Sequence, residues 1–300
     1  MTTERLPTRD DVVGYLRDRR NWGRWGADDQ RGAINLITRE KRVQAAQLVK
    51  SGRSVSLSRD FPVIPGRGNP MPAQHFVRTF GDAVVDYYGI VYHGYVATHV
   101  DALCHVWDGD GMWQGRDPKV EITTNGAMFG GIQHWRDGVT TRGVLLDVPK
   151  HRGQPFVTVD EPVHGLELEA IANAQGVSIE PGDALVVYSG RERYQEANRG
   201  WSGYQPPSPG LHASCLPFIR DNDVSVLCWD LMDASPNEYG VTWTVHGAIF
   251  SYGIALVDNA LLQPLAEACA EEGRYEFMFT FAPLAVIGGT GSPINPIVLL

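Results

Sequence analysis

Residues able to form a metal or acid–base site gather in segment 92–105, which holds three of the nine histidines of the chain. If residues 93–101 are extended, side-chain alternation places His93, Tyr95, His99 and Asp101 on one face. An imidazole and a carboxylate two residues apart suit a divalent cation such as zinc or manganese. A histidine that only hydrogen-bonds a neighbouring aspartate on a strand has the same spacing. His99 and Asp101 therefore indicate a site whose chemistry depends on the surrounding sequence.

The surrounding sequence carries a family signature. The run Thr98-His99-Val100-Asp101-Ala102-Leu103-Cys104-His105 resembles the T-H-x-D-A-x-x-H motif of the metal-dependent cyclase family, which includes bacterial kynurenine formamidases, isatin hydrolases and trans-dienelactone hydrolases. The resemblance extends to segments 24–29, 32–36, 181–183, 282–284 and 288–293, and so covers most of the chain from about Trp22 onward. It implies a swivelling β/β/α domain, usually oligomeric, and a divalent metal that activates water against a cyclic amide, formamide or lactone.

The resemblance also implies roles for single residues. The family ligands are a His or Gln four residues before the motif His, that His, the Asp two residues later and, in binuclear members, a distal His and Glu. Carried over, they make His99 and Asp101 metal ligands and His246 the distal histidine. His105 matches the histidine with an acid–base role.

Two positions depart from the family pattern. Tyr95 stands where the family has His or Gln, and Asp258 stands where the distal Glu is expected. A phenol with a pKa near 10 is a weak ligand at neutral pH, and aspartate is one methylene shorter than glutamate. His93, two residues upstream of Tyr95, is a candidate replacement ligand.

Three functions fit these residues. The first is a metal-dependent hydrolase in which a cation held by His99, Asp101 and His246, with Asp258 as a further ligand, activates water while His105 moves protons. The second is a metal-independent cyclase or lyase of natural-product biosynthesis that uses Tyr95, His99, Asp101 and His105 as acid–base groups for dehydration or intramolecular addition. The third is a small-molecule binder without activity. The first explains the motif, and the second explains Tyr95.

Composition narrows the class of protein. The 300 residues are 43% hydrophobic and 20% charged, which is typical of a globular protein with a sizeable core. A formal net charge of −9 disfavours nucleic acid and anionic membranes as partners. Without a signal-peptide pattern or a long apolar run we expect a cytoplasmic protein that acts on a small molecule, as a homodimer or homotetramer.

Mixed helix and strand signals predict an α/β fold. Helices are expected at 10–19, 39–50, 166–174, 246–252 and 261–272, and strands at 144–148, 184–188, 224–229 and 275–281. We expect residues 1–21 to form a helical extension and residues 22–300 to form the single cyclase-like domain.

Two long segments, 61–72 and 192–210, have no regular pattern, and the second is a candidate lid. Large aromatic residues near it and near the motif are candidates for the wall of a substrate pocket, and an arginine at a strand end could bind a substrate carbonyl or carboxylate. The substrate-binding candidates are Trp107, Arg191, Trp201 and Tyr204.

Overall fold

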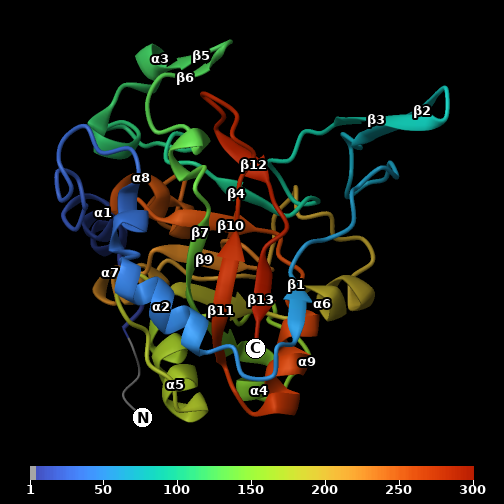
Figure 1. The fold of residues 1–300 in the computed structure, drawn as a ribbon. Helices are drawn as coiled ribbons and strands as arrows, with labels where there is room; N and C mark the ends of the chain where they lie inside the picture. The colour runs from blue at the N-terminus through green and yellow to red at the C-terminus, as the bar shows by residue number, and fades with distance from the viewer. Residues whose placement is uncertain (1–4) are drawn as a thin grey trace.

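A curled nine-stranded sheet runs through the centre of the protein (Figure 1). The computed structural model describes residues 5–300. The strands of the sheet are β1 (Ser54–Ser56), β4 (His99–Asp101), β7 (Val139–Asp147), β8 (Ala184–Tyr188), β9 (Val226–Trp229), β10 (Ala255–Asp258), β11 (Glu276–Phe281), β12 (Gly291–Pro293) and β13 (Ile297–Leu299). They are arranged in the order β1-β13-β11-β7-β8-β9-β10-β4-β12. Strands β7 to β10 are parallel, and the strands on either side of them pair antiparallel.

Both faces of the sheet are buried. In β8, Ala184 and Val186 belong to one hydrophobic cluster, while Leu185 and Val187 belong to the cluster on the opposite face. This continuous apolar run is typical of parallel strands covered on both sides. The strand prediction at 184–188 is confirmed, and the α/β class is confirmed with it.

Helices cover the sheet and the site. They are α1 (Arg9–Arg17), α2 (Arg39–Gln47), α3 (Pro118–Glu121), α4 (Val148–Arg152), α5 (Gly165–Gln175), α6 (Arg191–Ala197), α7 (Cys215–Asp221), α8 (Ala248–Tyr252) and α9 (Gln263–Glu272), with 3-10 turns at Gly32–Leu36, Trp113–Gly115, Ile132–Trp135 and Val245–Gly247. No helix among residues 5–300 has the length and apolar character needed to cross a bilayer.

Capping residues set several of the helix ends. Thr38 caps α2 by accepting from the Lys41 backbone amide. Gly176 and Gly273, both in the left-handed conformation, end α5 and α9. The helix expected at 10–19 is α1, whose Val12 and Leu16 are buried and which packs against α7 and α8.

Two expectations about strands need correction. The segment 93–101 is extended only over β4, because residues 93–97 form bends and Gly94 has a φ of 124°. Residue 148, expected to end a strand, begins α4.

The irregular segment 61–72 leads into a hairpin not anticipated from the sequence, β2 (Gln74–Phe80) and β3 (Ala83–Gly89), which projects from the body of the protein (Figure 1). A shorter hairpin is formed by β5 (Ile122–Thr123) and β6 (Gly126–Ala127).

Candidate active site

The site begins with the pairing of β4 and β10. The antiparallel register sets His99 opposite Asp258 and Asp101 opposite Leu256. Val100 enters the core on one face of the sheet, so His99 and Asp101, its neighbours in the strand, face the other side. Strand alternation and register therefore place the motif next to Asp258.

Three imidazoles surround the carboxylate of Asp101. His93 Nδ1 lies 2.9 Å from Asp101 Oδ1, His99 Nε2 lies 3.4 Å from it, and His105 Nε2 lies 3.7 Å from it. The His93 and His105 rings stack, with their centroids 3.9 Å apart. The structure thus brings together His99, Asp101 and His105, as expected, and adds His93 from the bent segment.

Asp101 is fully buried, and neither of its oxygens accepts a hydrogen bond from the described residues. The His93 nitrogen is close to it but is not aligned as a donor. Burial would raise the pKa of Asp101, but the imidazoles of His105, His93 and His99 hold it well below its usual range. A buried carboxylate without hydrogen bonds is unfavourable unless a cation binds it.

The tautomer of His99 also fits cation binding. His99 Nδ1 donates to the backbone carbonyl of Ala97 over 2.9 Å, which leaves Nε2 facing the carboxylates. Nε2 lies 3.4 Å from Asp101 Oδ1 and 3.8 Å from Asp258 Oδ2. Burial alone would lower the pKa of His99, but the two carboxylates raise it. A lone pair that faces two carboxylates requires a proton or a metal ion between them.

Two groups of side chains have the spacing of metal ligands. One is His93, Asp101 and His105, and the other is His99, Asp101 and Asp258; in each, the ligand atoms lie within 4.8 Å of one another. Together with the unpartnered oxygens of Asp101, this donor set of nitrogen and oxygen atoms fits a divalent cation such as zinc or manganese.

Asp258 has a different environment from Asp101. Its Oδ1 accepts a hydrogen bond from the Trp229 indole, and its Oδ2 lies 3.3 Å from His246 Nε2. Asp233 contacts the other ring nitrogen of His246 and accepts a hydrogen bond from the Val245 backbone amide. Burial would lower the pKa of His246, but Asp233 and Asp258 raise it well above its usual value. His246 therefore lies beside the candidate metal ligands, as expected, and contacts them through Asp258.

Tyr95 lies in a pocket of about 270 Å³ lined also by His99, His105, His246 and Asp258. Burial raises the pKa of Tyr95 to about 12, with a further contribution from Asp233 and Asp258. Its hydroxyl is therefore protonated at neutral pH and is suited to donate a hydrogen bond.

His93 reaches Asp101 because of β12. A Cβ added to Gly291 would lie 2.8 Å from His93 Cε1 and 2.5 Å from the Val100 carbonyl oxygen, so only glycine fits there. Thr290 Oγ1 lies 3.1 Å from His93 Nε2 and fixes the ring. The glycine-rich segment 288–291 therefore approaches the site closely.

The four substrate-binding candidates occupy different places. Trp107 is 43% exposed and lines a larger pocket together with His105. Tyr204 packs edge-on against Tyr95, with ring centroids 5.1 Å apart. Trp201 packs against Tyr194 and donates to Ser208, outside the residues that line the 270 Å³ pocket.

Arg191 lies at the start of α6 and is 3% exposed. Its guanidinium donates to the backbone oxygens of Tyr95 and Asp230 and to the side chain of Asn259. Arg191 therefore binds the polypeptide behind the pocket and holds the backbone of Tyr95 in place.

The segment expected to form a lid starts with α6 and then packs on Tyr95. Gly203 has a φ of +81°, and a Cβ at this position would lie 2.4 Å from the Tyr95 ring. The segment therefore packs against Tyr95, and none of residues 192–210 lines the 270 Å³ pocket.

Sequence reasoning missed Asp233 and Trp229 as partners of the site. Trp229 ends a buried strand and Asp233 follows in an irregular loop, so neither carries a spacing that indicates ligation. Only the fold shows that Trp229 donates a hydrogen bond to Asp258 and that Asp233 contacts His246.

Comparison with known proteins agrees with this architecture. The sequence model of the Cyclase family matches residues 54–236. The structure of a novel cyclase is 28% identical, with a TM-score of 0.81 over 95% of this chain and 99% of that chain. No curated protein matches the chain.

More distant structures share the fold. Isatin hydrolase A from Labrenzia aggregata, bound to benzyl benzoate, is 17% identical, with a TM-score of 0.57 over 85% of this chain and 97% of that chain. A protein from Bacillus stearothermophilus described as a predicted metal-dependent hydrolase is 14% identical, with a TM-score of 0.52 over 82% of this chain and 97% of that chain. The family match covers more than half of the sequence, and the chain belongs to the Cyclase family.

Proposed function

We propose that this protein is a metal-dependent hydrolase of a cyclic amide, an aryl formamide or a lactone. The observation that carries the proposal is the buried carboxylate of Asp101, whose oxygens accept no hydrogen bond from residues 5–300 while three imidazole nitrogens lie within 3.7 Å of Oδ1. Structures that share its fold are described as a predicted metal-dependent hydrolase and as isatin hydrolase A, which supports the same reaction class.

The proposed metal ligands are His99, Asp101 and His93. Asp258 and His246 are the proposed distal ligands. A divalent cation bound there would lower the pKa of water and polarise a carbonyl group. His93 takes the place that Tyr95 leaves vacant among the ligands, because its Nδ1 faces Asp101. Asp233 contacts His246 Nδ1 and so orients its ring, as carboxylates next to a metal site commonly do for metal-binding histidines.

His105 is the proposed proton acceptor. Its side chain is 23% exposed, whereas those of His99 and Asp101 are buried, so it lies where the cluster opens to the pocket. It can take a proton from the attacking water and return it to the leaving nitrogen or oxygen. Tyr95 can donate its hydroxyl proton in a hydrogen bond to the carbonyl oxygen as that oxygen gains negative charge.

The protonated Tyr95 hydroxyl in the same pocket supports a second candidate, a metal-independent cyclase or lyase acting through Tyr95, His99, Asp101 and His105. The test is hydrolysis of an aryl formamide, isatin and a γ-lactone by protein treated with a chelator and then resupplied with manganese or zinc. The proposal expects activity to disappear on chelation and to return with metal. Full hydrolysis by the chelated protein would overturn the metal dependence, and no hydrolysis with or without metal would favour the cyclase or lyase instead.

We also propose that the protein forms a homodimer or homotetramer through the β2–β3 hairpin. Of the 22 exposed large apolar side chains in residues 5–300, 12 lie in segment 61–91. Those on the two strands alone would bury roughly 700 Å², close to the ~800 Å² that each partner contributes to a standard interface. Light scattering should give a multiple of the 33.1 kDa chain mass. Phe80→Lys at the hairpin tip should lower that mass, whereas Ile287→Lys, equally exposed elsewhere, should not.

A further inference from the structure

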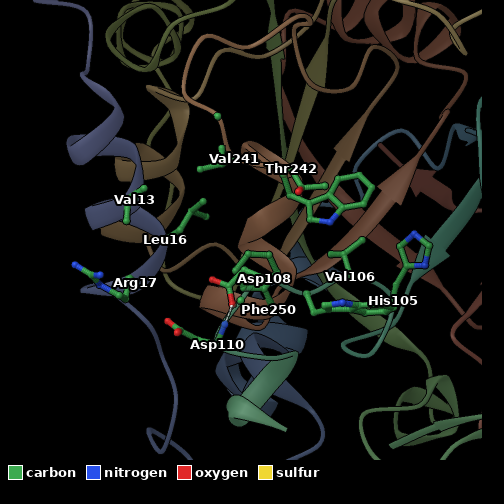
Figure 2. A pocket seen from close by; sticks show the side chains of 14 residues that line it. Val13, Leu16, Arg17, His105, Val106, Asp108, Asp110, Val241, Thr242 and Phe250 are labelled. Atoms are coloured by element: carbon green, nitrogen blue, oxygen red, sulfur yellow. Dashed lines mark hydrogen bonds between the residues drawn. The ribbon is translucent and has the colours of Figure 1, made fainter. Parts of the chain in front are cut away.

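A second cavity adjoins the catalytic pocket. It has a volume of about 620 Å³ and shares His105, Thr242 and Trp243 with the smaller pocket. Figure 2 shows it as a groove that runs from α1 to His105. A catalytic pocket of about 270 Å³ lies just below the ~300–1,000 Å³ range of small-molecule sites, whereas the groove lies within that range.

The wall of the groove is mainly apolar. The hydrophobic side chains that line it come from α1, from the segment after His105, from the loop before Trp243 and from α8: Val13, Leu16, Val106, Trp107, Val241 and Phe250. Leu16, Val106 and Phe250 are part of the buried core, so this wall is fixed by the fold.

The charged residues at its rim are already paired. Arg20 binds Asp108 over 2.6 Å and Asp110 over 2.9 Å, and Arg17 binds Asp18 over 3.1 Å. The groove therefore offers an occupant apolar contacts without an unpaired charge, which favours an uncharged ligand.

The position of α1 makes the N-terminal helix part of this wall. The Ser251 hydroxyl donates to the Leu16 carbonyl over 2.6 Å, and the Tyr252 hydroxyl donates to the Tyr15 carbonyl over 2.8 Å. Leu16 also packs against Gly247, where an added Cβ would lie 2.6 Å from its Cδ2. These contacts hold Val13 opposite the loop that carries Val241.

We infer that this groove is the binding site for an uncharged apolar substituent of the substrate, such as an alkyl or aryl group attached to the ring or acyl carbonyl that reacts beside His105. The inference rests on the proposed function for the reacting group. It adds that α1, outside the segment matched by the family model, selects substrates by the length of that substituent.

Cyclic ketones test the groove, because they carry the carbonyl of a lactone and cannot be hydrolysed. Calorimetric titration of the full-length protein with cyclopentanone, 2-pentylcyclopentanone and 2-heptylcyclopentanone should show affinity rising about threefold to fourfold per methylene until the groove is filled. Val13→Trp should lower the affinity for the heptyl ketone by about tenfold or more and leave that for cyclopentanone within about twofold. Val241→Trp, on the opposite wall, should do the same.

Val43→Trp is the matched control, because Val43 is 57% exposed on α2, away from the groove. Affinity independent of chain length would overturn the inference, as would equal losses in the Val13 and Val43 variants. Hydrolysis of γ-butyrolactone and γ-dodecalactone separates this result from the proposed function. Chain-length-dependent ketone binding without hydrolysis of the lactones, isatin or an aryl formamide would keep the groove and remove the hydrolase. Lactone opening without chain-length dependence would do the reverse.

Discussion

The two carboxylates at the centre of the site, Asp101 on β4 and Asp258 on β10, are both buried but differ in what surrounds them. Asp258 accepts a hydrogen bond from Trp229 and contacts a histidine that Asp233 holds in place. Asp101 has three imidazoles around it, and within the described part of the chain neither of its oxygens accepts a hydrogen bond. The fold therefore satisfies one carboxylate with its own donors and leaves the other to be satisfied by a cation.

The largest effect should come from Asp101→Asn. Loss of this charge should abolish cation binding and lower kcat/KM about 1,000-fold or more, since metal ions contribute several kcal/mol to such reactions. Metal analysis and steady-state kinetics measure the two effects. A variant that binds a divalent cation as tightly as the wild type would show that Asp101 is not a ligand.

Tyr95→Phe should lower kcat by roughly 10- to 1,000-fold, the range for loss of one acid–base or oxyanion donor, while metal content stays unchanged. Tyr95→His is the companion variant and should raise the affinity for zinc or manganese by restoring a ligand. A fully active Phe variant would leave Tyr95 as a wall of the pocket.

Asp233→Asn should weaken cation affinity or activity by about 10- to 100-fold, because His246 loses the partner that orients it. Calorimetric titration with manganese checks this value. Asp230→Asn is a matched control, since Asp230 accepts hydrogen bonds from the Ser189 and Gly190 backbone amides rather than from a site histidine. Equal losses in the two variants would mean that Asp233 acts only through folding.

The smallest effect is expected for Trp229→Phe, which removes the hydrogen bond to Asp258 and leaves the carboxylate in place. Stability should fall by about 1–3 kcal/mol, the cost of a buried group without its partner, and cation affinity should change only a few fold. Thermal unfolding and manganese titration measure the two effects. A loss of affinity as large as that of Asp101→Asn would remove the contrast between the two carboxylates.

The sequence predicted the parts of the site that depend on local spacing. Strand alternation places His99 and Asp101 on one face, and family resemblance pointed to His246 and Asp258. The register of β4 and β10 sets Asp258 opposite His99, and His246 contacts Asp258 from the 3-10 turn before α8. The sequence also predicted the helices α5 and α9. They end at Gly176 and Gly273, whose left-handed conformation is typical of the residue that ends a helix.

The remaining parts depend on contacts that no local pattern encodes. His93 joins the cluster only because its segment bends and Gly291 leaves room for its ring. Asp233 approaches His246 through an irregular loop. The β2–β3 hairpin escaped prediction because all of its strand residues except Gly89 are exposed, so neither face shows the alternation of a half-buried strand.

The most direct test of the account is equilibrium titration of chelator-treated wild-type protein and Asp101→Asn with manganese and with zinc, followed by calorimetry. The account predicts that the wild type binds at least one divalent ion per chain, and that the variant, folded by circular dichroism, binds none. Wild-type protein that binds neither ion, or an Asp101→Asn variant that binds as tightly as the wild type, would contradict it.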